Sequence, residues 1–150
     1  MSRQRALLVG VTGTNGKTSI TSFIAQLSRS CGTPGAAVGQ RIELGEQNLD
    51  RCFVGRGTGA LEAAFKKLEK QAHCQLIACE VYSAAIARRA HDDIPYDCAV
   101  FSNLATDHLD VHGSAERYHA DKLGFLKTLR AGTPLLVPVG GRREDVIIAA

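Results

Sequence analysis

The stretch VGVTGTNGKTS, residues 9–19, follows a short apolar run and carries three glycines, three threonines and one lysine. An apolar strand, a glycine-rich turn and Gly-Lys-Thr at the start of a helix form the pattern of a phosphate-binding loop, or P-loop. Glycines let backbone N–H groups turn toward an anion, and the positive end of the helix adds to the attraction. We expect Lys17 to meet the outer phosphates of a nucleotide and the Thr18 hydroxyl to hold Mg²⁺.

The spacing of this loop departs from the general pattern, which has glycine where this chain has Val11. An ordinary glycine turn before a helix is the alternative interpretation. The nucleotide-contacting residues that the pattern predicts are Gly13, Thr14, Asn15, Gly16, Lys17, Thr18 and Ser19.

Short apolar runs alternate with helical patterns along the rest of the chain. Strands are expected at 6–11, 36–38, 76–79, 98–101 and 135–139, and helices at 18–30, 61–72, 83–89 and 114–129. Continuous apolar strands that alternate with helices predict a mostly parallel sheet covered on both faces, a three-layer α/β fold. Residues 40–56 are less clear and fit a hairpin that turns at Gly45 and Glu46. Sheets of this kind bind ligands at the carboxyl ends of their strands.

The composition limits the possible classes of protein. A chain of 150 residues fits one domain. A net charge of +3, with no basic run between aromatic residues, argues against nucleic-acid binding. No apolar stretch approaches the ~20 residues that cross a bilayer, and the N-terminus does not read as a signal peptide. Five scattered cysteines without a CxxC pair favour reduced thiols in a cytoplasmic protein over a zinc site.

Three blocks of sequence occur in one order: TGTNGKTS (12–19), CEVYS (79–83) and FSNLATDHLDVHGSAERYHADKLGFL (101–126). Together they resemble the Mur ligase family, ATP-dependent enzymes that add amino acids to the peptidoglycan precursor. Within that family they are most similar to the UDP-N-acetylmuramoyl-tripeptide synthetases. The resemblance covers residues 6–130 and implies most of the nucleotide-binding central domain.

The resemblance implies that ATP phosphorylates a substrate carboxylate and that an amine then attacks the acyl phosphate. Two anions must meet in such a site, so cations have to neutralise them, here Lys17 and Mg²⁺. Glu80 ends an apolar run and is expected at the ligand-binding edge, where the resemblance makes it a Mg²⁺ ligand. A solvated loop glutamate is the alternative. Asn103 follows the next strand and either shapes the loop or contacts the nucleotide.

Two further candidates depend on the resemblance. It makes His108 a ligand of a second Mg²⁺, although imidazole is not a favoured magnesium ligand, and a histidine bonded to a tight loop is the alternative. It makes Lys122 a lysine that CO₂ carbamylates to support that metal, which requires a lowered amine pKa. The adjacent Asp121 opposes that lowering, and a paired surface lysine is the alternative. Lys17, His108 and Lys122 are the catalytic candidates.

The chain departs from the family where the substrate is expected. Tyr82 stands where the family block has serine, and Ala84 where it has histidine. Ser83 is retained, and Thr58 is the retained residue of the stretch that contacts the muramoyl group. Thr58 and Ser83 are therefore the substrate candidates, and nucleotide and metal binding is better supported than the identity of the second substrate.

We expect residues 1–150 to be a central ATP-binding domain, truncated, without the UDP-binding and C-terminal domains of Mur ligases. The expected activity is a carboxylate–amine ligase whose missing domains act in cis or in trans. A sister ligase, folylpolyglutamate or cyanophycin synthetase, is a weaker alternative. From another class, a non-catalytic ATP-binding module or partner subunit also fits a chain without flanking domains.

Overall fold

The structure, a computed structural model, describes residues 5–45, 47–51, 58–105, 114–140 and 147–148. Its strands and helices alternate along most of the chain, as the apolar runs predict. In chain order they are β1 (Leu7–Thr12), α1 (Lys17–Ser30), β2 (Gly35–Val38), β3 (Arg41–Leu44), β4 (Gln47–Arg51), α2 (Thr58–Gln71), β5 (Leu76–Glu80), α3 (Ser83–Ala87), β6 (Cys98–Phe101), α5 (Ala115–Thr128) and β7 (Leu135–Leu136).

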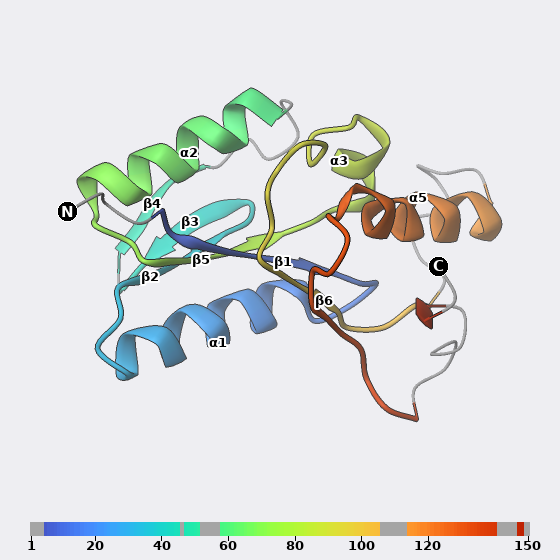
Figure 1. Ribbon diagram of the computed structural model, residues 1–150, viewed down its shortest axis with the longest axis horizontal. Coiled ribbons are helices and arrows are strands. Elements are labelled where there is room, and N and C mark those ends of the chain that lie inside the picture. The colour runs from blue at the N-terminus through green and yellow to red at the C-terminus, as the bar shows by residue number, and fades with distance from the viewer. Residues whose placement is uncertain (1–4, 46, 52–57, 106–113, 141–146, 149–150) are drawn as a thin grey trace.

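The seven strands form one sheet in the order β4-β3-β2-β5-β1-β6-β7. Neighbouring strands from β2 to β7 in this order are parallel, and the β2–β3 and β3–β4 pairs are antiparallel. The mostly parallel α/β fold is thus confirmed, and so is the hairpin, which consists of β3 and β4. Figure 1 shows α1 on one face of the sheet and α2, α3 and α5 on the other, which gives the three layers.

The register brings the strand ends together around β1, the central strand of the parallel part. Val11 lies opposite Glu80 of β5, and Thr12 lies opposite Phe101 of β6. Because parallel strands all end at the same edge, the loops that follow β1, β5 and β6 meet there. This edge carries the candidate site.

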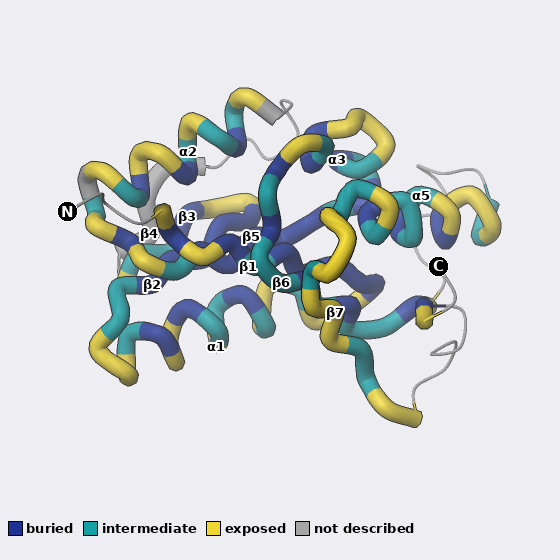
Figure 2. Tube along the Cα trace, in the orientation of Figure 1, coloured by how far each residue is buried: buried dark blue, intermediate teal, exposed yellow. Residues whose placement is uncertain are grey.

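The larger core cluster lies between the sheet and the helices of one face. Leu61, Phe65 and Leu68 of α2 are buried against the sheet, and Phe125 of α5 is fully buried beside them (Figure 2). On the other face, α1 packs through small side chains, with Ala25 fully buried. No helix in the described ranges has the length and apolar character to cross a bilayer.

Two predicted elements end earlier than the sequence suggests. The strand expected at 135–139 is only β7, two residues long, because Pro138 lacks the N–H that a longer parallel pairing needs. The helix expected to reach Arg89 ends at Ala87, and Arg89 has a positive φ of 57°. A left-handed residue just after a helix stops it and turns the chain away.

A buried histidine lies in the segment between α3 and β6. His91 is 1% exposed, its Nδ1 lies 2.8 Å from the Tyr96 hydroxyl, and Phe125 contacts its ring edge-on. Its Nε2 has no hydrogen-bond partner among the described residues. Burial disfavours the charged imidazole and lowers the pKa of His91 from 6.5 to about 4, although Asp92 opposes this slightly.

We expect this histidine to make the fold acid-sensitive. The unfolded chain binds the proton below pH 6.5 and the folded chain only near pH 4, so stability is lost as pH falls between these values. The difference corresponds to about 3 kcal/mol. Urea unfolding at pH 7.5 and pH 4.5 should show this loss in the native chain and a smaller one in His91→Gln. The exposed His73→Gln is the control and should behave like the native chain; an unchanged loss in His91→Gln would contradict the prediction.

Candidate functional site

The P-loop begins where β1 ends, and two glycines set its shape. Gly13 has φ 133° and Gly16, the residue before α1, has φ 85°, both in the region that favours glycine. A Cβ on Gly13 would overlap the Ser102 side chain and lie 3.0 Å from the Asn103 nitrogen. The loop can therefore lie against the end of β6 only because residue 13 has no side chain.

The segment after β6 holds the loop in place. The Thr14 N–H donates to the Asn103 carbonyl at 3.0 Å, and the Asn15 N–H donates to Asn103 Oδ1 at 3.0 Å. The Asn15 carbonyl accepts from Ser102 Oγ at 2.6 Å and from Asn103 Nδ2 at 3.0 Å. Of the two roles that the sequence leaves open for Asn103, these contacts make it a residue that shapes the loop.

Two side chains of helix α5 also hold the P-loop in place. The Tyr118 hydroxyl donates to Thr14 Oγ1 at 3.2 Å, and that oxygen also bonds both backbone groups of Ala105. Lys122, only 1% exposed, donates from Nζ to the Gly13 carbonyl at 2.7 Å and lies 4.8 Å from the Tyr118 ring centroid. The Lys122 amine thus contacts both the P-loop backbone and the Tyr118 ring, and it ties α5 to the loop.

Lys17 is the first residue of α1 and turns back over the loop. Its Nζ donates to the Gly13 carbonyl at 3.0 Å and to the Thr14 carbonyl at 2.9 Å, and it lies 6.0 Å from the Tyr82 ring centroid. The first turn of α1 contains no acidic residue, and Gly16 offers no side chain to cap it. The helix N-terminus and the ammonium therefore form a positive end suited to an anion.

A cavity of about 420 Å³ opens between this loop and the ends of β2 and β5. It brings Lys17 and Thr18 to the same space as Glu80, as the sequence predicts. Its lining residues are Thr14, Asn15, Gly16, Lys17, Thr18, Thr21, Ala37, Gly39, Gln40, Arg41, Glu43, Glu80 and Tyr82.

Glu80 is the buried acidic group of this cavity. It is 3% exposed, and its Oε2 has no hydrogen-bond partner among the described residues. A Cβ at Gly39 would come within 2.8 Å of the Glu80 Cδ, so the glycine makes room for the carboxylate. A buried carboxylate oxygen without a donor is strongly unfavourable unless a cation or donor joins it. Glu80 is therefore suited to bind a cation in the cavity.

Tyr82 is a neighbour of Glu80 in this cavity. Its half-buried position, together with the Glu80 carboxylate, raises the pKa of the Tyr82 hydroxyl. The phenol therefore stays neutral over the physiological range and adds no negative charge beside Glu80. Among the described residues no three His, Cys, Asp or Glu side chains form a metal-binding group. Glu80 would need oxygen ligands of other kinds, such as the Thr18 hydroxyl and nucleotide phosphates, which suit Mg²⁺.

The model of one protein family, described as "Mur ligase middle domain", matches residues 11–144 of this chain. This chain belongs to that family. The chain is 37% identical over 119 residues to the UDP-N-acetylmuramoyl-L-alanyl-D-glutamate–2,6-diaminopimelate ligase of Geobacillus kaustophilus, covering 79% of this chain and 24% of that protein. It is 40% identical over 123 residues to the ligase of the same name from Pseudomonas aeruginosa, covering 77% and 24%. The chain thus spans about a quarter of the length of these relatives.

The fold of this chain is also similar to that of solved structures. A UDP-N-acetylmuramoyl-L-alanyl-D-glutamate–2,6-diaminopimelate ligase superposes with a TM-score of 0.83 at 25% identity, covering 97% of this chain and 29% of that one. An Escherichia coli FolC structure with DHPP and ADP superposes with a TM-score of 0.63 at 19% identity, covering 97% and 40%. At that identity the second likeness shows a shared fold only.

Four further residues were predicted to belong to the site, namely His108, Ser19, Thr58 and Ser83. His108 lies outside the described residues. Ser19 is exposed in the first turn of α1, Thr58 begins α2, and Ser83 begins α3 with 7% of its surface exposed. Neither Ser19 nor Ser83 lines the cavity.

Sequence reasoning also missed residues that the cavity contains. They are Gly39, Gln40, Arg41 and Glu43, which come after or within the second and third strands, and the cavity role of Tyr82. The sequence did contain a signal for these cavity residues. Gly39 directly follows the apolar run 36–38, so the end of that strand predicts that it lies at the ligand-binding edge of the sheet.

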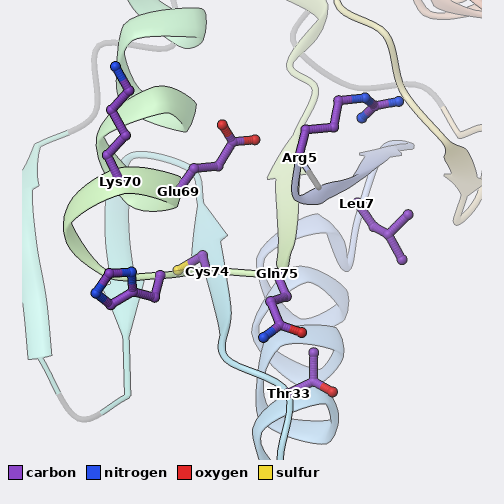
Figure 3. Close-up of a pocket in the computed structure, with 8 residues that line it drawn as sticks. Arg5, Leu7, Thr33, Glu69, Lys70, Cys74 and Gln75 are labelled. Atoms are coloured by element: carbon purple, nitrogen blue, oxygen red, sulfur yellow. The ribbon is translucent and has the colours of Figure 1, made fainter. Parts of the chain in front are cut away.

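A larger hollow of about 640 Å³ lies among residues at the start of β1 and β5, away from the P-loop. Figure 3 shows Glu69 and Lys70 extending from α2 and Arg5 from the segment before β1. Glu69 accepts from the Ala6 N–H at 3.0 Å, and Arg5 pairs with Asp97 at 2.6 Å. Glu69 and Arg5 therefore already have partners in the protein, and the lining of the hollow includes no P-loop residue, so size alone does not make it the functional site.

Proposed function

We propose that this chain is the nucleotide-binding core of an ATP-dependent carboxylate–amine ligase of the Mur type, acting in peptidoglycan precursor synthesis in the cytoplasm. The observation that carries the proposal is one cavity that joins the P-loop ammonium of Lys17 to the buried, unpartnered carboxylate oxygen of Glu80. The P-loop would bind a triphosphate, and the carboxylate at the neighbouring strand end would hold the divalent cation that accompanies it.

Each residue of the cavity has a part in this proposal. The loop N–H groups and the α1 N-terminus bind phosphate oxygens, and Lys17 exchanges its two carbonyl acceptors for the outer phosphates. Thr18 and Glu80 would hold Mg²⁺, and their oxygen donors fit that ion. When bound, Mg²⁺ would lower the repulsion between the triphosphate and an incoming carboxylate.

The reaction we propose has two steps. A carboxylate oxygen of the substrate forms a bond to the γ-phosphorus while the bond from that phosphorus to the bridging oxygen breaks, and ADP leaves. The amine nitrogen then attacks the acyl carbon, the carbon–oxygen bond to phosphate breaks, and the amine proton passes to solvent or a base. The released phosphate therefore keeps one oxygen of the original carboxylate.

Lys122 and His108 keep their predicted metal-supporting roles as part of this proposal. A carbamate on Lys122 would retain one N–H, enough for the observed bond to the Gly13 carbonyl. Native mass spectrometry of the intact chain in bicarbonate would detect the added CO₂, which should be absent from Lys122→Arg.

An isotope experiment tests the reaction. The chain, alone and with the remaining domains of a Mur ligase added in trans, is incubated with Mg-ATP, ¹⁸O-labelled UDP-N-acetylmuramoyl-L-alanyl-D-glutamate and diaminopimelate. The proposal expects inorganic phosphate carrying one ¹⁸O and amide product, both absent with Lys17→Ala. Phosphate release without ¹⁸O would show hydrolysis rather than acyl transfer and would contradict the proposal.

A non-catalytic ATP-binding module is the second candidate, because the P-loop cavity by itself accounts for nucleotide binding and not for turnover. Such a module would bind nucleotide in the same cavity without turnover under any substrate mixture. A folylpolyglutamate synthetase-like ligase is weaker, since two solved structures of those enzymes are 17% and 22% identical to this chain and show a shared fold only.

A further inference from the structure

Tyr82 contacts both charged groups of the P-loop cavity, although it stands where the family block has serine. Its ring centroid lies 6.0 Å from Lys17 Nζ, and its hydroxyl hydrogen-bonds to the Glu80 carboxylate. All three residues line the same cavity. A side chain particular to this chain therefore joins the P-loop ammonium to the buried carboxylate.

The backbone on either side of Tyr82 fixes where its side chain begins. β5 ends at Glu80 and α3 begins at Ser83, and Tyr82 lies between them in an extended conformation, with φ −83° and ψ 145°. Its carbonyl accepts from the Ala85 N–H at 3.0 Å and from the Ile86 N–H at 2.9 Å, which ties it to the first turn of α3. Because residues two apart in an extended chain project to the same side, Glu80 and Tyr82 both face the cavity.

The turn between β2 and β3 completes the contacts of the phenol. The Gly39 N–H donates to the Arg41 carbonyl at 2.9 Å, and the Gln40 N–H within this turn donates to the phenol oxygen of Tyr82. A phenol has one proton to donate, so a phenol that accepts from a backbone N–H gives that proton to its other partner. The hydrogen bonds thus run from Gln40 through Tyr82 to the carboxylate of Glu80.

The phenol satisfies the buried carboxylate only in part. Glu80 is 3% exposed, and its Oε2 has no hydrogen-bond partner among the described residues. A phenol is a neutral donor, so it reduces the cost of burying the carboxylate without cancelling the negative charge. Groups that hydrogen-bond a metal-binding carboxylate fix its orientation and so strengthen the binding of the metal.

We propose that Tyr82 is a positioning residue for the divalent cation of this site. This inference rests on the nucleotide and cation binding of the proposed function and deepens it. The Tyr82 hydroxyl holds the Glu80 carboxylate in one orientation and leaves Oε2 for the cation, while the ring stays beside Lys17. The hydroxyl therefore raises cation affinity without itself binding the cation.

The variant Tyr82→Phe tests this role, because it removes the hydroxyl and keeps the ring that packs on the core and faces Lys17. Mn²⁺ titration with the ATP analogue AMPPCP, followed by electron paramagnetic resonance, should show about a tenfold loss of Mn²⁺ affinity. Affinity for AMPPCP without a divalent cation should stay unchanged. The matched control is Tyr96→Phe, which removes a core phenol that bonds His91 outside the cavity lining and should bind Mn²⁺ like the native chain.

A second measurement uses no cation. Urea unfolding of the native chain, Tyr82→Phe, Glu80→Gln and the double variant forms a double-mutant cycle. A hydrogen bond to an ionised carboxylate is about twice as strong as one between neutral groups. Tyr82→Phe should therefore lower the unfolding midpoint about twice as much in the native background as in the Glu80→Gln background. A hydroxyl that serves packing alone would give equal shifts in both.

The outcomes separate this inference from the proposed function. Native Mn²⁺ affinity in Tyr82→Phe, or equal midpoint shifts in the two backgrounds, would overturn the inference and leave the proposed function standing. A native chain that binds AMPPCP without Mn²⁺ would overturn both. Normal Mn²⁺ binding that depends on the Tyr82 hydroxyl, together with phosphate that carries no ¹⁸O, would overturn the proposed reaction and support the role of Tyr82.

Discussion

Replacing Lys17 with alanine should lower the affinity of the chain for Mg-ATP about 100-fold or more. The Nζ group lies over the P-loop and donates to two backbone carbonyls, which the charged oxygens of a triphosphate can replace as acceptors. A charged contact between this ammonium and the outer phosphates is lost in the variant, and the phosphates then lie at the loop without their counter-charge.

Calorimetry with a non-hydrolysable ATP analogue and Mg²⁺ measures this effect. Lys66→Ala, which removes an exposed lysine paired with Glu62 on α2, is the matched control and should bind like the native chain. Circular dichroism should show the same fold for both variants, because the Gly13 carbonyl still accepts from Lys122. Undiminished affinity in Lys17→Ala would mean that the nucleotide does not use the P-loop.

Replacing Glu80 with glutamine should move stability and cation binding in opposite directions. The carboxylate is buried with one oxygen unpartnered, so removing its charge should raise the free energy of unfolding by about 1–3 kcal/mol. The same change removes the buried anion that holds the divalent cation, and affinity for Mn²⁺ in the presence of nucleotide should fall at least about 100-fold.

Thermal unfolding without ligand and Mn²⁺ titration followed by electron paramagnetic resonance give the two readouts. Glu62→Gln on α2 is the control, since its partner Lys66 is solvent-exposed and the pair adds little stability. A Glu80→Gln variant that is less stable and binds Mn²⁺ normally would show that Glu80 serves packing rather than cation binding.

The sequence alone was enough to predict the parallel sheet and the edge of that sheet where the candidate site lies. Apolar runs of strand length that alternate with helices leave few arrangements, and parallel strands bring their carboxyl ends together. Glu80 could be placed near Lys17 for this reason alone, without any knowledge of a contact. The shared cavity agrees with that placement.

The contacts within the edge could not be predicted. Tyr118 bonds Thr14 across 104 residues of chain, and Ser102 bonds Asn15 across 87. Such pairs depend on the angle at which α5 and the segment after β6 pack on the sheet, which no local pattern encodes. The same holds for Arg41, whose place depends on a bulge in an antiparallel hairpin.

The frame around Thr14 and Asn15 has a consequence for binding kinetics. Asn103 and Ser102 bond the loop backbone, and Tyr118 bonds the Thr14 side chain, so little conformational entropy remains to be lost when a triphosphate binds. Association should accordingly approach the speed of a rigid-body encounter, with a single side-chain swing of Lys17 as the main adjustment. Differences in affinity among nucleotides would then come mainly from their dissociation rates.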